Sequence, residues 1–520
     1  MKDKQSFVTG AIILGVSGIV AKFLGLFFRW PVTMLIGDEG IGIYQLSYPI
    51  YMFILGILSG FPVAISKMVS ERIATGKDYQ AYRVFKVSLR ILSIIGAAAS
   101  ILLYIFAPLI LKLLKWRSDA YYSLIAISFA PFFVSVMNGF RGYFQGIQMM
   151  SMPAASQIIE QLGRVIVGVG LTYIFMPYGV SISAAGASFG ACAGAILGCI
   201  LLFAGYMVQK KRFLKAAVLD KSQDENIVKE LLKIALPISI GMTVGSIMSL
   251  IDSAVVPARL LAAGFSQKTA TELYGQLTGK AHVLINVPLT FSVALGTSLV
   301  PAMSEVKAIR NMDRIKNRAE SAIKVSMIVA IPSAIGLFIL SDPILHLIFP
   351  GRGEGGEILR LLSISVVFIV LAQTLVSILQ GVGNVTSPVK NIAIGALFKL
   401  FFVFILTSMP MLNISGAAIS TILGYAVTAV LNFKDASECA YISFDIDKMF
   451  LRPLLSGIAM GIIVNMSYNR MIILSGNNGI TTILSIIAGI IVYMIMLIIT
   501  GSVSARDINN YIKYRRKRKR

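Results

Sequence analysis

Residues 145–153 read QGIQMMSMP and residues 380–388 read QGVGNVTSP, and this pair of stretches indicates how the whole chain is organised. Each begins with Gln-Gly, passes through a short polar turn and ends at a proline, so that Pro153 of the first matches Pro388 of the second. Long apolar runs flank both stretches. A turn that recurs between apolar runs at a fixed offset indicates a duplicated multi-helix unit.

Nearly the same offset holds elsewhere in the chain. SKMVSER at 66–72 aligns with VPAMSEV at 300–306, and SAAGASFG at 183–190 aligns with NISGAAIS at 413–420 after a short deletion in the second copy. Each copy contains six apolar segments, and an even number of crossings inserts both copies the same way up. We therefore expect two six-helix lobes related by an axis along the membrane normal, as in transporters built from parallel repeats.

The composition predicts an all-α polytopic membrane protein. Of the 520 residues, 56% are hydrophobic and 14% are charged, and the mean hydropathy is +0.81. Soluble domains average roughly 25% charged residues, and crossing a hydrocarbon core of ~30 Å takes about 20 apolar residues. We predict about 14 transmembrane helices, over residues 7–35, 44–66, 88–111, 120–140, 155–176, 184–208, 234–258, 281–304, 325–348, 361–380, 391–409, 415–433, 453–469 and 480–501.

The predicted domains follow from these spans. An N-terminal lobe is expected over residues 1–208 and a C-terminal lobe over 234–438, with two additional helices within 439–505. The polar segment 209–233 is predicted to be an amphipathic linker at the cytoplasmic surface. Residues 506–520 are predicted to be a basic cytoplasmic tail.

The distribution of positive charge predicts the orientation. Of the 47 lysines and arginines, 34 lie in segments on the side of the N-terminus and 9 lie in segments on the opposite side. Because cytoplasmic loops carry the excess of Lys and Arg, both termini are predicted to be cytoplasmic. The net charge of +23 then follows from topology, and the tail KYRRKRKR is expected to face anionic lipid rather than nucleic acid.

The remaining basic residues fall inside predicted spans, and they are Lys22, Arg29, Arg164 and Lys399. Arg164 stands as far beyond Pro153 as Lys399 stands beyond Pro388, so the two are equivalent in the repeat. A cation at mid-membrane costs about 2.5–3.5 kcal/mol on the insertion scale. We therefore predict that these four residues bind substrate in a cavity, and the alternative is snorkelling or local ion pairing.

Two acidic residues also fall inside predicted spans. Glu160 lies one turn before Arg164 and could neutralise it, whereas Gly395 occupies the equivalent position before Lys399. Asp252 could pair with one of the bases or bind a cation. Glu160 and Asp252 are therefore candidates for charge pairs or for ion or proton sites.

The first span has its own arrangement of charge. Lys22 and Arg29 lie two turns apart and share a helix face, and Trp30-Pro31 predicts a kink. Within the predicted spans, four bases against two acids leave an excess of positive charge. Such a cavity suits an anion such as a lipid pyrophosphate, whereas a pocket for organic cations would be acidic or aromatic.

Three stretches resemble a known family: KFLGLFFRWPVTMLIGDEGIGIYQLSYPIY at 22–51, GFPVAISKMVSER at 60–72, and the FQG…P element. They resemble the multidrug/oligosaccharidyl-lipid/polysaccharide exporter superfamily, within it the sporulation and polysaccharide-biosynthesis branch of Gram-positive spore-forming bacteria. The resemblance covers nearly the whole chain. Two times six helices with two extra helices is also similar to the lipid II flippase branch.

The resemblance implies a function and a site. It implies a V-shaped pair of lobes that moves undecaprenyl-pyrophosphate-linked oligosaccharide, a lipid II-like precursor, across the bacterial cytoplasmic membrane for spore cortex or cell-wall synthesis. The cavity pattern of the first helix is matched by Lys22, Leu24-Gly25 and Arg29, with Lys in place of the first Arg and one extra residue before the second. The second-helix arginine of lipid II flippases has no match in residues 53–66. Helices 453–469 and 480–501 would offer a groove for the lipid tail.

Two other function classes stay open. A cation-coupled multidrug exporter would share the fold, and a polytopic glycosyltransferase would use Asp445 and Asp447 in the stretch SFDID. No P-loop sequence is present, and His282 and His346 fall in different spans. We expect a monomeric transporter with no catalytic residue, metal site or cofactor, which is driven by H⁺, Na⁺ or the membrane potential.

Overall fold

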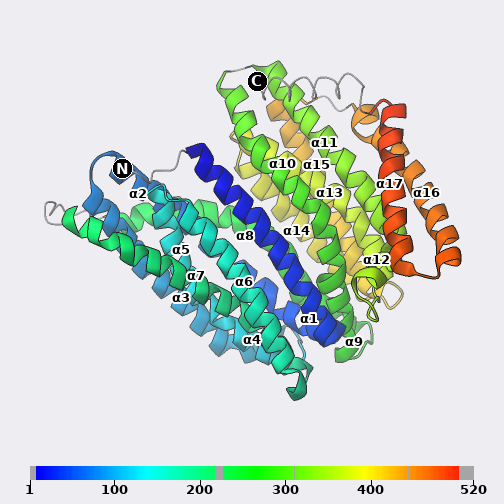
Figure 1. Ribbon diagram of the computed structural model, residues 1–520, viewed down its shortest axis with the longest axis horizontal. Coiled ribbons are helices and arrows are strands. Elements are labelled where there is room, and N and C mark those ends of the chain that lie inside the picture. The colour runs from blue at the N-terminus through cyan, green and yellow to red at the C-terminus, as the bar shows by residue number, and fades with distance from the viewer. Residues whose placement is uncertain (1–6, 217–225, 310, 443–444, 503–520) are drawn as a thin grey trace. The chain divides into compact units, whose positions relative to one another are not determined.

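The computed structural model describes residues 7–216, 226–309, 311–442 and 445–502, and these residues are largely helical (Figure 1). Within these ranges, 12 helices are long and apolar enough to cross a membrane, which confirms an all-helical multi-pass protein. The candidate Ile13–Ala74 contains two predicted spans, and the helix at predicted span 155–176 is not among the 12. The number 14 and the side on which the termini lie stay predictions.

Contacts between helices divide the chain into two compact units, Met1–Gly275 and Gln276–Arg520. The first unit contains α1 (Phe7–Leu58), α2 (Gly60–Ala74), α3 (Asp78–Leu113), α4 (Ala120–Ser128), α5 (Ala130–Gly146), α6 (Ser151–Ile174), α7 (Val180–Ala216), α8 (Ile227–Ala262) and α9 (Gln267–Gly275). The second unit begins with a short π-helix (Gln276–Ala281) and contains α10 (His282–Ala308), α11 (Met312–Ile339), α12 (Ser341–Ile348), α13 (Gly356–Gly381), α14 (Thr386–Leu406), α15 (Asn413–Ala440), α16 (Arg452–Ser475) and α17 (Asn478–Ile499).

Helix α8 belongs by its contacts to the first unit, although the predicted C-terminal lobe begins at residue 234. A Cβ atom added to Gly60 would lie 2.8 Å from the backbone nitrogen of Ser239, and one added to Gly56 would lie 2.9 Å from Cα of Thr243. The predicted lobe boundary, which rests on sequence alone, stays a prediction. Residues 217–225 of the predicted linker and the whole predicted tail lie outside the described residues.

Helix α1 consists of two helices that meet at Gly37. The φ of Gly37 is 67° and its ψ is −168°, a conformation that glycine adopts at little steric cost. The rings of Phe28 and Tyr44, on opposite sides of Gly37, lie 5.8 Å apart, so the chain reverses there and the two halves run alongside each other. The sequence predicted a kink at Trp30-Pro31, but the backbone leaves helical geometry later, at Gly37.

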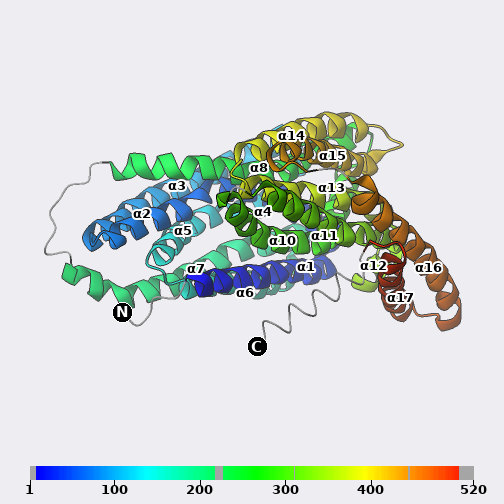
Figure 2. The same ribbon diagram turned by 90° about the horizontal axis from the view of Figure 1, so that it is seen from above.

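Helices α1, α6 and α7 lie side by side (Figure 1 and Figure 2). Helices α6 and α7 cross at glycines: a Cβ atom added to Gly190 would lie 2.7 Å from Cα of Gly168. One added to Gly194 would overlap the backbone oxygen of Glu160 and lie 3.1 Å from the backbone nitrogen of Arg164. Small residues allow this backbone approach between membrane helices. The crossing therefore fixes the segment of α6 that carries Arg164.

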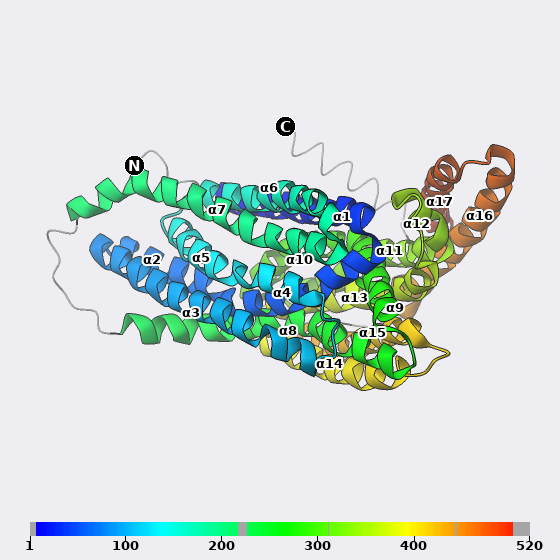
Figure 3. The same cartoon turned by 90° about the horizontal axis from the view of Figure 1, so that it is seen from below.

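The second unit has an equivalent crossing between α14 and α15, which also run side by side (Figure 3). A Cβ atom added to Gly424 would lie 2.8 Å from Cβ of Lys399 and 2.9 Å from the backbone oxygen of Gly395. In the repeat alignment, Gly424 is the counterpart of Gly194, and Lys399 is the counterpart of Arg164. The repeat found in the sequence therefore connects two glycine crossings that each lie beside a basic residue.

A second pair of contacts recurs in the same alignment. An added Cβ atom at Gly186 would lie 2.9 Å from the carbonyl carbon of Leu171, and one at Gly416 would lie 2.5 Å from that of Leu406. The two glycines are counterparts in the repeat, and so are the two leucines. Equivalent helix pairs in the two units thus pack through equivalent residues.

Helices α16 and α17, which lie outside the repeat, form a pair (Figure 3). The hydroxyl of Tyr493 on α17 donates a hydrogen bond to the backbone oxygen of Ile328 on α11 at 3.0 Å. A Cβ atom added to Gly457 on α16 would lie 2.6 Å from Cδ1 of Ile335 on the same helix α11. The two helices therefore dock on α11, and the lipid-tail groove implied by resemblance stays a prediction.

The glycine crossing predicts a strong contrast between two substitutions. Gly194→Ala places a methyl group against the backbone of α6 and should destabilise the protein by roughly 1–3 kcal/mol, as overpacking does. Gly170→Ala, also in this helix pair, places its methyl group in open space and should be neutral or stabilise by up to about 1 kcal/mol through helix propensity. Thermal unfolding in detergent micelles measures both. Equal melting temperatures for the two variants would contradict the close approach of α6 and α7.

Candidate functional site

Arg164 on α6 is held by aromatic residues of α1, and only 9% of its surface is exposed. Its guanidinium donates one hydrogen bond to the hydroxyl of Tyr48 at 3.1 Å and another to the hydroxyl of Tyr44. It also lies 5.1 Å from the ring centroid of Phe28 and 4.7 Å from that of Tyr48. Phe28 precedes Gly37 and the two tyrosines follow it, so both halves of α1 are needed to build the site.

The partners of Arg164 are neutral. Among the described residues, no carboxylate forms an ion pair with its guanidinium, and its Nε–H group is buried without a hydrogen-bond partner. Phenol oxygens accept hydrogen bonds but carry no compensating charge. Since a buried ion without a counterion costs several kcal/mol, an anion that reached this guanidinium would be bound favourably.

The local ion pair that the sequence allowed between Glu160 and Arg164 is not formed. Glu160 Oε2 accepts a hydrogen bond from Nη2 of Arg141 at 2.8 Å, and Nε of Arg141 donates to Oγ of Ser156 at 2.8 Å. Arg141 lies one residue beyond the predicted span 120–140, but the structure places it inside α5 with 12% of its side chain exposed. Spacing along one helix could not show that a neighbouring helix supplies a second base.

Arg29 and Lys22 occupy different environments, although the sequence places them on one helix face. The Cζ atom of Arg29 lies 5.8 Å from the ring centroid of Tyr48, so Arg29 and Arg164 share this tyrosine. Lys22 is exposed on α1 and forms no ion pair with any residue in the described part of the chain. The predicted cations of the first unit therefore divide into a pair of guanidinium groups around Tyr48 and an exposed ammonium group.

Lys399 is 1% exposed on α14 in the second unit, where it packs against Gly424. Its burial at the glycine crossing is equivalent to that of Arg164. The prediction that Lys399 shares a substrate cavity with Arg164 stays a prediction.

Asp252 lies on α8 in the first unit and is 2% exposed. Asp252 is therefore a buried acid of the same unit as Arg29 and Arg164. Its role as an ion or proton site stays a prediction.

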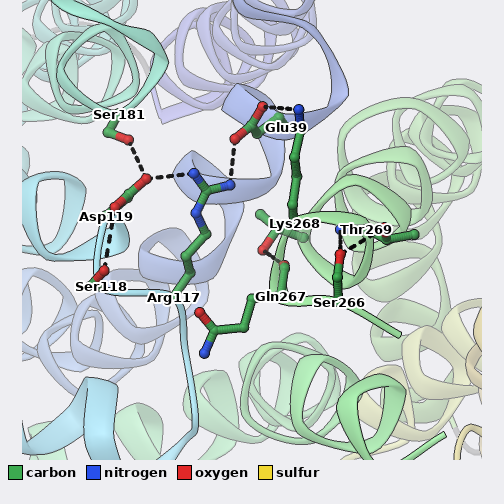
Figure 4. Close-up of polar contacts among 10 residues, drawn as sticks. Glu39, Arg117, Ser118, Asp119, Ser181, Ser266, Gln267, Lys268 and Thr269 are labelled. Atoms are coloured by element: carbon green, nitrogen blue, oxygen red, sulfur yellow. Dashed lines mark hydrogen bonds and ion pairs between the residues drawn. The ribbon is translucent and has the colours of Figure 1, made fainter. Parts of the chain in front are cut away.

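A polar network that the sequence did not reveal joins four segments of the first unit (Figure 4). Arg117, between α3 and α4, contacts Glu39 of α1 and lies 2.6 Å from Oδ2 of Asp119. Ser181 of α7 donates to the same oxygen at 2.9 Å, and Lys268 of α9 lies 3.7 Å from Oε2 of Glu39. Its members are polar residues near helix ends, which hydropathy does not distinguish from ordinary loop residues.

Asp119 gives this network a defined pH range. Burial alone would raise the pKa of the Asp119 carboxyl, but the hydrogen bond from Ser181 and the charge of Arg117 outweigh burial and hold the pKa below its ordinary value of 3.8. A carboxyl with a lowered pKa stabilises the folded state above its unfolded pKa, and this contribution is lost as the pH falls through the folded pKa. The network should therefore persist at neutral pH and weaken only in acid.

Substitutions at Asp119 and Ser181 test this pH dependence. At neutral pH, Asp119→Asn and Ser181→Ala should each lower the free energy of unfolding by about 0.5–1 kcal/mol. The deficit of Asp119→Asn should shrink as the pH falls below 3.8, because the wild-type carboxyl then takes up a proton. Denaturant unfolding in micelles at several pH values measures this.

Ser118→Ala is the control for this series, because the exposed Ser118 hydroxyl is 3.4 Å from Asp119 Oδ1 and should contribute little. A deficit of constant size for Asp119→Asn at every pH would exclude the ionised carboxylate as its source.

The carboxylates considered for a glycosyltransferase are engaged locally. Asp445 pairs with Lys448 at 3.0 Å, and Asp447 pairs with Arg452 at 2.7 Å. No group of three or more metal-binding side chains occurs within the described ranges. These contacts give the two aspartates a structural role at the start of α16.

Comparisons with known proteins agree with the fold. Residues 7–307 match the family of polysaccharide biosynthesis proteins, and residues 281–405 match the MatE family. The chain is 29% identical to stage V sporulation protein B of Bacillus subtilis (strain 168), covering 86% of this chain and 87% of that protein. It is 26% identical to the lipid II flippase MurJ of the same organism, covering 88% of each.

Among solved structures, the inward closed conformation of the lipid II flippase MurJ is similar to this chain, with a TM-score of 0.70. The alignment covers 93% of this chain and 98% of that one at 18% sequence identity. This likeness supports the helical architecture predicted from the sequence.

Proposed function

The chain belongs to the family of polysaccharide biosynthesis proteins, and we propose that it is a flippase of the bacterial cytoplasmic membrane. Its substrate is an undecaprenyl-pyrophosphate-linked oligosaccharide, a lipid II-like peptidoglycan precursor for spore cortex or cell-wall synthesis. The relatives support this assignment, because one carries a sporulation name and another is a lipid II flippase. The duplicated helical units suit alternating access, in which lobes rock around a central site.

One observation carries the proposal: the buried guanidinium of Arg164 has neutral partners, and a second guanidinium, that of Arg29, lies at the same tyrosine. Two guanidinium groups match a diphosphate, because each can donate two parallel hydrogen bonds to phosphate oxygens. The polyprenyl chain would stay in the bilayer. Lys22 adds positive charge to the proposed binding surface of the first unit, and Lys399 is proposed as the equivalent substrate-binding base of the second unit.

Energy for transport comes from the membrane potential or from an H⁺ or Na⁺ gradient in this proposal. One elementary charge moved through 100 mV is worth about 2.3 kcal/mol. Glu160 and Asp252 are the candidate coupling sites in the first unit: Glu160 is engaged by Arg141, and Asp252 is buried on α8.

A cation-coupled multidrug exporter is the second candidate, and the match of residues 281–405 to the MatE family favours it. An exporter of organic cations would need acidic or aromatic groups open to the drug. Phe28 and Tyr48 offer aromatic faces, but the guanidinium of Arg164 already lies over both rings. This arrangement favours an anionic substrate over a cationic one.

Transport of fluorescent lipid II in proteoliposomes tests the proposed function. Arg164→Ala should lower the transport rate by about tenfold or more, the size expected for the loss of hydrogen bonds from a charged group. Arg164→Lys should restore only part of the transport rate, because an ammonium group cannot donate two parallel hydrogen bonds as the planar guanidinium does. Arg90→Ala, which removes an exposed arginine of α3, is the matched control and should transport normally.

Unchanged transport in a variant carrying both Arg164→Ala and Lys399→Ala would overturn the assignment of these cations. Ion flux that a cationic drug stimulates, in liposomes where lipid II is neither bound nor moved, would instead establish the exporter.

A further inference from the structure

We propose that Arg141 is a positioning residue that keeps the carboxylate of Glu160 away from Arg164 and so preserves the charge of Arg164 for an anionic ligand. This inference deepens the proposed function and rests on the ligand being a lipid-linked diphosphate. Within the described residues, no hydrogen bond joins Arg141 to Arg164, and the proposed effect of Arg141 passes through Glu160.

The geometry of α6 creates the need for such a residue. Glu160 and Arg164 are one turn apart on the same helix, a spacing at which carboxylate and guanidinium side chains can pair. Glu160 is also within electrostatic range of Tyr48, one of the two tyrosines that hold Arg164. A Glu160–Arg164 ion pair would cancel the charge that makes the site attractive to an anion.

Arg141 prevents that pair through its own contacts with Glu160 and Ser156. Its Nη2 atom lies 2.8 Å from the Glu160 carboxylate, and its Nε–H group is anchored on Ser156, whose hydroxyl in turn donates to the backbone oxygen of Pro153. The side chains of Arg141 and Glu160 are only 12% and 17% exposed. A pair this buried is hard to separate, because each charge would lose its counterion where water cannot replace it.

The second copy of the repeat lacks both the acid and the base that pairs with it. In the alignment that matches Pro153 with Pro388, Val376 on α13 is the counterpart of Arg141 and Gly395 on α14 is the counterpart of Glu160. The acid and the base that pairs with it are thus both present in the first copy and both absent in the second. In the first copy the acid one turn before Arg164 is bound to another residue, and in the second copy no acid stands one turn before Lys399.

The test measures binding of fluorescent lipid II to the full-length protein in phosphatidylcholine nanodiscs, where no anionic lipid competes. Arg141→Leu releases Glu160, which should pair with Arg164 and weaken binding by about tenfold. Adding Glu160→Gln to Arg141→Leu should restore binding to within about threefold of wild type, since the amide cannot neutralise Arg164. Arg141→Lys should bind normally, because it retains the ion pair.

Rescue by Glu160→Gln separates positioning from a general structural effect, because a packing defect at Arg141 would persist in the double variant. If Arg141→Leu does not fold, Arg141→Gln removes the charge while keeping a hydrogen-bonding side chain, and the same rescue is expected. Wild-type binding by Arg141→Leu, or failure of the second substitution to restore binding, overturns the inference.

A structural measurement tests the role of Arg141 independently of the proposed function. If wild-type protein binds no lipid II, the proposed function fails while the inference about Arg141 can still be judged. In a cryo-EM structure of Arg141→Leu, Glu160 is expected within about 4 Å of the Arg164 guanidinium, the range of an ion pair. A Glu160 carboxylate that stays away from Arg164 in that variant overturns the inference whether or not lipid II binds.

Discussion

The guanidinium of Arg164 is held in the first unit by phenol hydroxyls and aromatic rings instead of a carboxylate, and much of the surrounding structure serves this contact. The reversal of α1 at Gly37 is required because Phe28 and the two tyrosines lie on opposite sides of it. The glycine crossing of α6 and α7 is required because a bulkier residue at Gly194 would push α6 out of place. Chain reversal and helix crossing together allow a charged side chain to be buried without being neutralised.

The duplication shows which parts of this arrangement are general. Glycines at equivalent positions, Gly194 and Gly424, lie beside Arg164 and Lys399 in the two units. The surroundings of the two bases differ, because the first copy pairs an acid with a base from α5 and the second copy lacks both residues. Equivalent backbones therefore carry different side chains around the two bases.

Much of the fold could be predicted from the sequence, since apolar runs of membrane length are read directly from residue type. The bases Arg164 and Lys399 could be found because a charge stands out in an apolar helix and the repeat gave each a counterpart. The partners of Arg164 could not be found, because tyrosines within a span look like ordinary packing residues. The contact between Arg141 and Glu160 was missed because the two residues lie on different helices, and the network around Arg117 was missed because its members come from four separate segments.

The contacts between α1 and Arg164 also have a consequence for how the chain enters the membrane. Tyr48 lies far ahead of Arg164 in the sequence and is therefore synthesised first. When the segment that becomes α6 leaves the ribosome, the hydroxyls that will receive its guanidinium are already part of the nascent chain. The order of synthesis therefore makes the hydroxyl partners on α1 available before the helix that carries the buried cation.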